Sequence, residues 1–341
     1  MADGRRRAYI GSFTAAGGPG IVTAEVDPGS GALTVLSSVN AVQDPSCLTL
    51  APDGRTLYAV SETADGAVAA YRVDGDKPDP AGRPVPVDGS GPTHLDLFDG
   101  HVLTANYGSG SVTAVPVRPN GTLARSASSV LRHSGAGPHT PRQQGPHAHH
   151  VQPDPSGRWA VSVDLGTDSV RVCTLTDGAL ALHRETALRP GSGPRHLAFH
   201  PGGSHAYVVN ELSPSVTVCR WDAATGVLTS LSETPVLPGA PARDAYPSGI
   251  VTSPDGRFVW TATRGEDVLS VLAVEGEELR LVTTVHCGGH WPRALAASDG
   301  FLYVANERSG DVTWFAVDPL TGVPGRGGSI WVTAAACVAL G

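Results

Sequence analysis

The sequence predicts an all-β fold, a seven-bladed β-propeller of four-stranded antiparallel blades. Glycine (42 residues) and proline (28 residues) are abundant among the 341 residues. Such frequent turn signals between short apolar runs indicate many short strands. One apolar run that follows a tight turn occurs six times, and the turn glycines are separated by 46, 57, 46, 53 and 44 residues. A repeat of about 50 residues is typical of propeller blades.

Each repeated run has the composition of a buried strand and begins just after its turn. The runs are Leu57–Glu62, Val102–Tyr107, Trp159–Asp164, Ala206–Glu211, Phe258–Arg264 and Leu302–Glu307. Around each run the sequence divides into four strands. In one unit they are Arg195–His200, Ala206–Glu211, Ser215–Trp221 and Val227–Thr234. The last two are joined by DAATG (Asp222–Gly226), in which glycine supplies the positive φ that a hairpin turn requires.

The two ends of the sequence complete each other. The first unit starts at Tyr9–Phe13, which resembles a second strand, so this unit lacks its inner strand. Near the other end, Ala336–Leu340 resembles Ser46–Leu50, the inner strand of the next unit. We therefore expect residues 1–341 to form one seven-bladed domain, whose first blade is completed by a C-terminal strand at about residues 330–341.

Composition excludes several classes of protein. The net charge is −8, with one lysine, Lys77, and a nucleic-acid binder would need a basic face. Hydrophobic residues make up 40% of the chain, which excludes wholesale disorder. No apolar run approaches the roughly 18 residues of a membrane span, so we expect no membrane partner.

Location and assembly are less constrained. Met1–Arg7 is basic, but Ala8–Thr14 is too short and polar for the apolar part of a signal peptide. The five cysteines are scattered and odd in number, which indicates free thiols and a cytoplasmic protein. The oligomeric state is left open between monomer and dimer.

The entry of each inner strand is expected to face the central channel. We pair the residue eight positions before each turn glycine with the residue eight positions after it, or seven in the two shorter hairpins. The pairs are Ser46–Glu62, His149–Leu165, Arg195–Glu211, Ser248–Arg264, Thr93–Tyr107 and Arg293–Glu307. Because the pairs are symmetric about their glycines, we expect the members of each to lie side by side at one end of the blade.

These positions carry unusual chemistry for strand ends. Three arginines, three glutamates and a histidine occur where most of each strand is valine, alanine, leucine or tyrosine. In an alternative interpretation, Arg195–Glu211 and Arg293–Glu307 are cross-strand ion pairs that only fix the blade ends. The set as a whole favours a site for a small anionic molecule, because several blades converge on one channel.

A histidine cluster lies in GPHAHH, Gly145 to His150. Strand alternation would point His147 and His149 to one side and His150 to the other. No nearby carboxylate or cysteine pattern completes a metal site, so we expect no cofactor and a metal is the less favoured alternative. An acid–base role for His149 is favoured. The remaining histidines are interpreted mostly as structural, with His290 a weaker site candidate; they are His196, His200, His286 and His290.

With these motifs the sequence resembles the seven-bladed propeller lactonase family, which groups bacterial 6-phosphogluconolactonases with 3-carboxy-cis,cis-muconate cyclases. The resemblance extends over nearly the whole chain, and the segment GPRHLAFHPGGSHAYVVNEL is its most specific part. The matching segments are Tyr9–Thr14, Pro45–Glu62, Gly145–Trp159, Gly193–Leu212 and Tyr246–Arg264. The C-terminal segment GRGGSIWVTAAACVALG departs from the family, which usually has a proline-rich approach there, so the register of the closing strand stays open.

The resemblance implies functional residues. In the cyclase branch a histidine, two arginines and a glutamate line the channel mouth, and they match His149, Arg195, Arg264 and Glu211. Arg293 resembles a further arginine of the lactonase branch. We expect further substrate contacts from neighbouring rim positions, which are Glu62, Tyr107, His147 and Glu307.

The resulting hypothesis is a hydrolase that opens a small anionic lactone, carrying a phosphate or a carboxylate. Arg195, Arg264 and Arg293 would bind the anion, and one of them would stabilise the oxyanion. Either His149 or Glu211 would act as general base. Because Glu211 beside Arg195 should stay ionised, His149 is the first choice.

Two alternatives stay open at the level of sequence. The same residues suit a carboxymuconate-type cycloisomerase or lyase, or a specialised biosynthetic enzyme on the same scaffold. The chain is alternatively a non-catalytic propeller that binds a partner.

Overall fold

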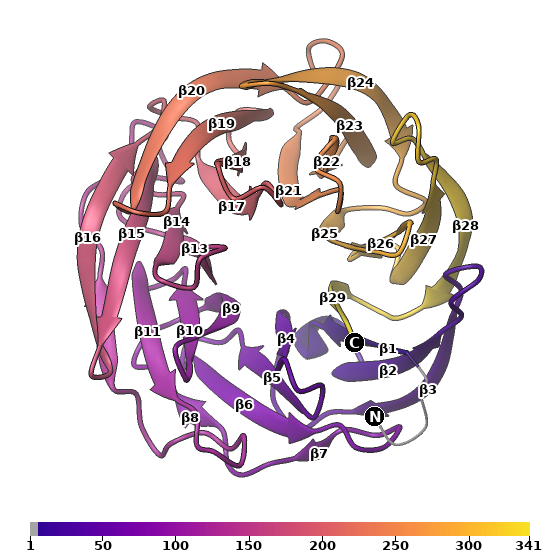
Figure 1. Cartoon of the computed structure of the whole chain (residues 1–341). Helices are drawn as coiled ribbons and strands as arrows, with labels where there is room; N and C mark the ends of the chain where they lie inside the picture. The colour runs from indigo at the N-terminus through magenta and orange to yellow at the C-terminus, as the bar shows by residue number, and fades with distance from the viewer. Residues whose placement is uncertain (1–5) are drawn as a thin grey trace.

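Seven antiparallel sheets surround a central channel in the computed structural model, which describes residues 6–341 (Figure 1). Residues 1–5, and with them most of the basic segment Met1–Arg7, lie outside the described residues. The first blade has the strand order β29-β1-β2-β3, so the last strand of the chain is its inner strand. The predicted propeller and its closure by the C-terminal strand are therefore confirmed.

The strands of the seven blades follow one another in chain order. Blade 1 consists of β29 (Ala335–Leu340), β1 (Arg7–Ser12), β2 (Ile21–Val26) and β3 (Leu33–Val39). Blade 2 consists of β4 (Leu48–Leu50), β5 (Thr56–Ser61), β6 (Ala67–Arg72), β7 (Asp79–Pro80) and β8 (Val85–Pro86). Blade 3 consists of β9 (Pro92–Phe98), β10 (His101–Asn106), β11 (Ser111–Pro116) and β12 (Ser129–Arg132). Blade 4 consists of β13 (Ala148–Pro153), β14 (Ala160–Asp164), β15 (Ser169–Thr176) and β16 (Ala179–Ala187).

The last three blades are the most regular. Blade 5 consists of β17 (Pro194–Phe199), β18 (His205–Asn210), β19 (Ser215–Asp222) and β20 (Val227–Pro235). Blade 6 consists of β21 (Tyr246–Thr252), β22 (Phe258–Arg264), β23 (Val268–Glu275) and β24 (Glu278–His286). Blade 7 consists of β25 (Pro292–Ser298), β26 (Phe301–Asn306), β27 (Asp311–Val317) and β28 (Pro324–Trp331). The closing strand thus begins at Ala335, later than the expected residue 330, because residues 324–331 form the outer strand of blade 7.

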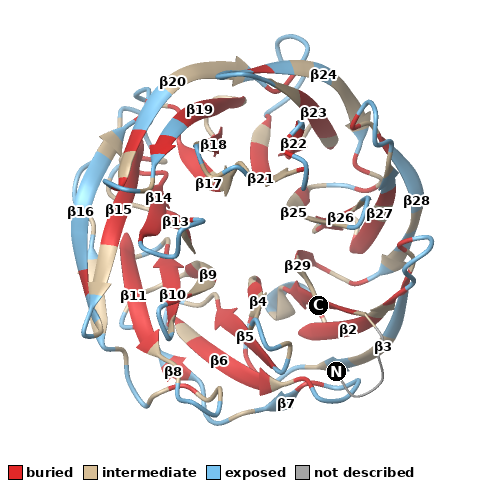
Figure 2. Cartoon of the chain, viewed as in Figure 1, coloured by how far each residue is buried: buried red, intermediate tan, exposed pale blue. Residues whose placement is uncertain are grey.

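Burial decreases from the middle of each blade to its outer edge (Figure 2). The second strand β22 is buried at every position, because neighbouring blades cover both of its faces. The outer strand β16 is exposed at most positions, because only its inner neighbour and the adjacent blade cover it. The apolar second strands that repeat in the sequence are therefore the core of each blade.

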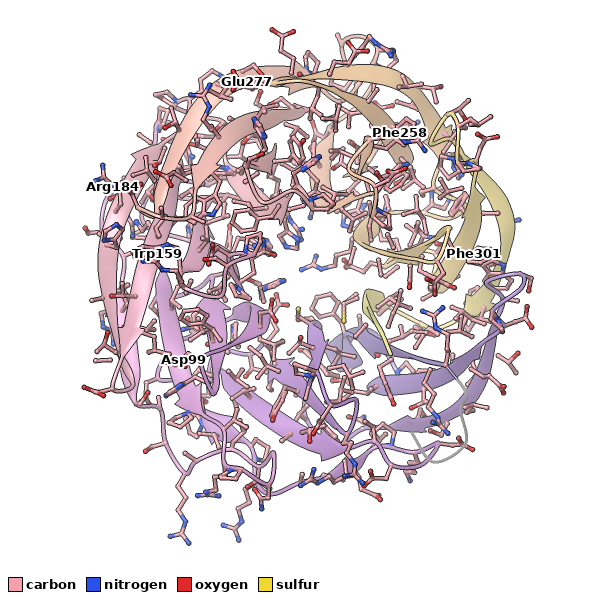
Figure 3. The ribbon with its side chains drawn as sticks, in the orientation of Figure 1. Asp99, Trp159, Arg184, Phe258, Glu277 and Phe301 are labelled. Carbon is pink, nitrogen blue, oxygen red and sulfur yellow. The ribbon has the colours of Figure 1, made fainter. Side chains whose placement is uncertain are left out.

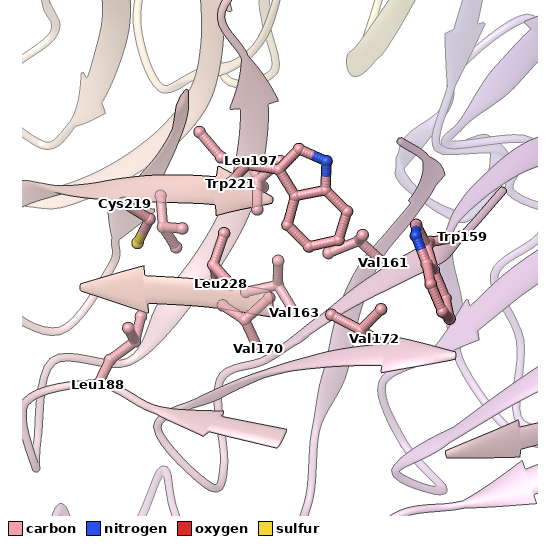
Figure 4. Packing of buried hydrophobic residues seen from close by; sticks show 12 residues of the cluster. Trp159, Val161, Val163, Val170, Val172, Leu188, Leu197, Cys219, Trp221 and Leu228 are labelled. Carbon is pink, nitrogen blue, oxygen red and sulfur yellow. The ribbon is translucent and has the colours of Figure 1, made fainter. Parts of the chain in front are cut away.

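The blades are held together by apolar layers between neighbouring sheets. Between blades 4 and 5, for example, Trp159, Val163 and Val170 pack in one cluster with Leu197 and Trp221 (Figure 4). The indole Nε1 of Trp221 also donates a hydrogen bond of 3.2 Å to Asp154 Oδ2 in blade 4. This packing fixes each inner strand, and hence the walls of the channel, relative to the next one.

The inner strands share an irregularity at their entry. In β17, Pro194 pairs with Asn210 and His196 pairs with Val209, which leaves Arg195 as an extra, unpaired residue of a β-bulge. The same shift occurs at the entry of β9, β13, β21 and β25, and near the start of β29. The predicted symmetric pairing about the turn glycine is therefore wrong at the strand ends, because the bulge inserts one residue. The backbone partner of Glu211 is Gly193, at 2.7 Å, and not Arg195.

Candidate functional site

A cavity of about 450 Å³ occupies the central channel. At its wall, neighbouring residues at the entries of six inner strands line the cavity together, and in most of these blades a β-bulge at the entry interrupts the alternation of side chains. These pairs are Ser46–Cys47, Thr93–His94, His149–His150, Arg195–His196, Arg293–Ala294 and Ala336–Cys337. Glu62 also lines the cavity, from the end of the second strand of blade 2. We call His149, Arg195, Arg293 and Glu62 the channel site.

Glu211 does not line the cavity, and each of its two carboxylate oxygens contacts at least one arginine. Its Oε2 accepts a hydrogen bond of 2.7 Å from Arg264 Nη2 and lies 3.0 Å from Arg195 Nε. Its Oε1 accepts one of 2.6 Å from Arg142 Nη2. Burial alone would raise the pKa of Glu211, but Arg264, Arg195, His149 and Arg142 together hold it well below its ordinary value. The carboxylate therefore stays ionised, as predicted, and has little basicity.

Arg142 is a site residue that sequence reasoning missed. It belongs to the loop between β12 and β13, and its guanidinium also donates a 3.3 Å hydrogen bond to the hydroxyl of Tyr107. The sequence contains one signal for this loop, since the separation of 57 residues between Gly100 and Gly157 is the largest in the series. An insertion of that length in a compact domain often serves a binding site.

The second charged group of the site is centred on Arg293. Its Nη1 donates to Glu307 Oε2 at 3.1 Å, and its Nη2 lies 3.8 Å from Glu62 Oε1. The guanidinium carbon lies 4.7 Å from the ring centroid of Phe13, an aromatic contact that the sequence pattern does not indicate. Burial raises the pKa of Glu62, although Arg293 and a hydrogen bond from the Ser46 hydroxyl lower it.

Two carboxylates of the site therefore differ in their acid–base properties. Glu211 is fixed as an anion, whereas burial makes Glu62 easier to protonate. The ion pairs around the channel join four arginines to three glutamates, so this region has an excess of positive charge that favours an anionic ligand.

Four histidines converge on the cavity from three adjacent inner strands. The ring centroids of His94 and His150 are 4.0 Å apart, and His196 lies 4.7 Å from His150 and 5.2 Å from His149. The expectation that His150 points away from His149 is therefore wrong. His196, interpreted from the sequence as structural, also lines the cavity. We call these four residues the histidine cluster.

Burial makes the histidine cluster neutral. It lowers the pKa of His94 to about 4, and it lowers those of His149, His150 and His196 well below their ordinary value. The charge of Arg195 lowers all four further. Among the described residues, the buried Nδ1 atoms of His94, His149 and His150 have no hydrogen-bond partner. Their rings are therefore held mainly by packing, and these unpartnered Nδ1 atoms are closed off from solvent.

Other predicted residues lie around the site without lining the cavity. The His147 ring stacks on Tyr107 with centroids 4.3 Å apart, and Tyr107 also touches His149 edge-on at 5.5 Å. The Arg264 guanidinium lies over the rings of Tyr246 and Trp291, at 6.0 and 5.8 Å. These residues other than His149 pack around the channel site, and none of them lines the cavity.

Half of the predicted pairs form a direct side-chain contact. The contacts join Ser46 to Glu62, Arg195 to Glu211 and Arg293 to Glu307. The Ser248 hydroxyl instead donates to the carbonyl groups of Ala262 and Pro292, and the Thr93 hydroxyl donates to the carbonyl group of His149. Both hydroxyls therefore tie neighbouring strand ends together.

The remaining histidine candidates lie outside the channel. His286 is an exposed residue at the end of the outer strand β24, and His200 contacts His205 and Tyr207 beside a turn. Between residues 6 and 341, no group of three or more histidine, cysteine, aspartate or glutamate side chains has the arrangement needed for a metal ion. That the protein needs no metal stays a prediction.

The histidine cluster predicts how stability depends on pH. Because the folded pKa values lie below the unfolded value, the unfolded chain binds more protons once the pH falls below about 6.5. The free energy of unfolding should fall from pH 7 to pH 5, by about 1.4 kcal/mol per pH unit for each histidine protonated only in the unfolded chain. Urea unfolding at several pH values measures this slope. His150→Gln should reduce it, and an unchanged slope in that variant would contradict this interpretation of the cluster.

The chain is similar to known proteins over nearly its whole length. A family model described as "Lactonase, 7-bladed beta-propeller" matches residues 7–340. The 6-phosphogluconolactonase of Bacillus subtilis (strain 168) is 35% identical over 323 residues, which cover 92% of each chain. The periplasmic gluconolactonase of Pseudomonas aeruginosa has a TM-score of 0.90 at 30% identity, covering 98% of this chain and 99% of the other. A protein from Lactobacillus plantarum has a TM-score of 0.92 at 28% identity, with coverage of 98% and 99%.

Proposed function

The chain belongs to the seven-bladed β-propeller lactonase family, and from this premise we propose that its channel site opens the ring of a small anionic lactone. The protein is a hydrolase, a lactonase of the 6-phosphogluconolactonase type. Its substrate in this proposal is a sugar lactone that carries a phosphate.

One observation carries the assignment of the base. His149 is neutral and lines the cavity, whereas Glu211 is surrounded by three arginines and does not line the cavity. Both groups have lowered pKa values and are weak bases, so the assignment rests on position: His149 lines the cavity in which water and the lactone would meet, and Glu211 does not. His149 is therefore the base of the proposal, and Glu211 is a positioning residue for the arginines.

The reaction needs two proton transfers and a group that stabilises the negative charge that forms on the carbonyl oxygen. Water adds to the lactone carbonyl carbon while His149 takes its proton, and the carbonyl oxygen becomes an oxyanion. Arg195 and Arg293 line the cavity on either side of blade 6 and would stabilise that oxyanion. The ring C–O bond then breaks, and protonated His149 returns the proton to the leaving alkoxide. The lowered pKa of His149 favours this second transfer and makes the first one harder.

Arg264 has a different role from the one first expected. It does not line the cavity, and its guanidinium is bound to Glu211 and to the carbonyl oxygens of Tyr246 and Pro247. It therefore fixes the Glu211 carboxylate, which in turn holds Arg195 at the cavity wall. We expect Glu62 to accept a hydroxyl hydrogen of the sugar, since it also lines the cavity.

We also place the protein in the cytoplasm in this proposal. All five cysteines are free, and a reducing compartment keeps thiols in that state. Between residues 6 and 341 the structure contains no helix of the length and apolarity needed to cross a membrane. Cell fractionation tests the location. Recovery of the protein in the periplasm, the compartment given for the Pseudomonas aeruginosa gluconolactonase, would contradict it.

The test of function is hydrolysis of freshly prepared 6-phosphoglucono-δ-lactone above its spontaneous rate. We expect a rate proportional to protein concentration and unchanged by a chelator. Loss of the rate with chelator would show that a metal is required. If the rate does not exceed the spontaneous one and the protein converts a carboxylated muconate or its lactone, the proposed activity is wrong and the protein is a cycloisomerase.

A further inference from the structure

A second pocket, of about 590 Å³, opens on the same face of the propeller, between blades 6 and 7. It is formed by loops before β21 and β25 and by the turns after β22 and β26, so it lies at the same strand ends as the channel site. Its lining includes Arg243, Tyr246, Trp291 and Arg308. We call it the outer pocket. Nothing in the proposed chemistry of the channel site uses it.

Specific contacts hold Trp291, which forms one wall of the outer pocket. The backbone of Trp291 has a φ of 64°, in the left-handed region that a bulky side chain rarely adopts. Its backbone N–H donates a 2.8 Å hydrogen bond to Asp267 Oδ1, which holds this conformation. The guanidinium carbon of Arg308 lies 3.3 Å from the centroid of the indole, and Arg264 lies against the same ring at 5.8 Å. Trp291 therefore orients two arginines.

Two of the arginines have no carboxylate partner. Among residues 6–341, no aspartate or glutamate oxygen lies within ion-pair distance of Arg308 or Arg243. The nearest acidic groups of the lining are Asp244, which is exposed, and Asp267, whose two oxygens are engaged by Trp291 and by His290 Nδ1 at 2.9 Å. Both arginines are exposed, so their guanidinium N–H groups are hydrated in the free protein and are available to bind an oxygen anion bidentately.

A short chain of contacts connects the outer pocket to the channel site. Trp291 touches Arg264, Arg264 donates to Glu211 at 2.7 Å, and Glu211 lies 3.0 Å from Arg195 at the cavity wall. The two pockets share no lining residue, so a molecule whose reactive end lies at Arg195 reaches the outer pocket only if its anionic tail extends past Arg264.

We propose that the outer pocket binds the anionic tail, a phosphate or carboxylate, of the substrate whose lactone ring lies in the channel site. Arg308 and Arg243 then determine specificity, because they distinguish a phosphorylated lactone from its uncharged analogue. This inference rests on the proposed lactonase function. The occupant is an oxygen anion and not an apolar ring, because guanidinium groups already pack against Trp291.

The experiment compares two substrates in one variant. Arg308→Ala should lower kcat/KM for 6-phosphoglucono-δ-lactone about 10- to 100-fold more than for glucono-δ-lactone, as expected for loss of a hydrogen bond to a charged group. The loss should be in KM, and Arg308→Lys should restore only part of it, because lysine keeps the charge without the planar fork. Arg184→Ala, on the outer strand β16 at the edge of the molecule, is the control (Figure 3). Equal losses for both lactones, or no loss, would overturn the proposal.

Direct binding separates this proposal from the proposed function. Calorimetry with 6-phosphogluconate and with gluconate needs no turnover. Suppose that the wild-type protein shows no lactonase rate but binds 6-phosphogluconate at least tenfold more tightly than gluconate, and that Arg308→Ala removes this preference. The outer pocket then binds the phosphate as proposed, and the proposed reaction is wrong. Equal binding of the two acids by the wild-type protein would overturn the pocket, whatever the reaction.

Discussion

His149→Ala should lower kcat for lactone hydrolysis about 10²- to 10⁴-fold, the usual contribution of a general base. KM should change little, because the arginines of the channel site bind the substrate and the imidazole acts on water. The residue is buried and neutral, so its removal leaves no unpaired charge. Initial rates over a range of lactone concentrations, corrected for spontaneous hydrolysis, separate the two constants.

The control for this variant is His101→Ala. His101 begins β10, whereas Tyr107 of the site region follows the other end of that strand, so His101 lies at the far end of blade 3. Its replacement should leave both constants unchanged. If His149→Ala raises KM and leaves kcat intact, His149 binds substrate and the base is another group, with Glu62 the next candidate.

Glu211→Gln should lower the free energy of unfolding by about 3–5 kcal/mol, the cost of removing one partner from a buried ion pair. The substitution keeps the shape of the side chain but removes its charge. Arg195 and Arg264, which are almost fully buried, would then lack their counter-charge. Since burial and Arg264 already lower the pKa of Arg195 to about 9, the cost of holding its charge is high in the native protein. Urea unfolding with a constant m-value measures the change.

A surface pair provides the matched control for Glu211→Gln. Glu277 accepts a hydrogen bond from Arg220 at the outer edge of the ring, and both side chains are about half exposed (Figure 3). Glu277→Gln removes the same charge, but exposed pairs contribute at most about 1 kcal/mol. Similar losses in the two variants would mean that water reaches the Glu211 cluster and that the buried network does not exist as described.

The fold follows from the sequence because its signals are local. Each blade is marked by a tight turn with glycine and by an apolar second strand, and neither depends on distant residues. Ring closure was predictable from a comparison of distant segments, since Ala336–Leu340 resembles Ser46–Leu50, the inner strand of the next unit. The lengths of the outer strands in blade 2 were not predictable, because the short strands β7 and β8 depend on packing against β6.

The site was predicted in part, and the bulge explains the rest. Counting from the turn glycine selected Arg195 and Arg293, but strict alternation hid their neighbours, and the position of His94, His150 and His196 at the cavity was missed. A bulge is a property of pairing between strands, so periodicity along one strand cannot show it. A proline before the channel residue gives a partial signal, as in Pro92, Pro194 and Pro292, because proline cannot donate to the ladder.

Arg142 shows a different limit. Its loop contains glycine and proline in abundance, and its conformation is fixed by contacts such as the hydrogen bond from Gln143 Nε2 to Asp168 Oδ1, at 2.7 Å. These contacts exist only once blades 3 and 4 are assembled. The length of the loop is visible in the sequence, but the position of its arginine over Glu211 is not.

The most direct test of the channel site is a crystal structure of the protein with 6-phosphogluconate, the product of the proposed reaction. The product carboxylate should lie in the channel, within hydrogen-bond distance of His149 and of Arg195 or Arg293, and the phosphate should lie in the outer pocket at Arg308. A carboxylate bound at the opposite mouth of the channel, or outside it, would contradict the assignment of the channel site.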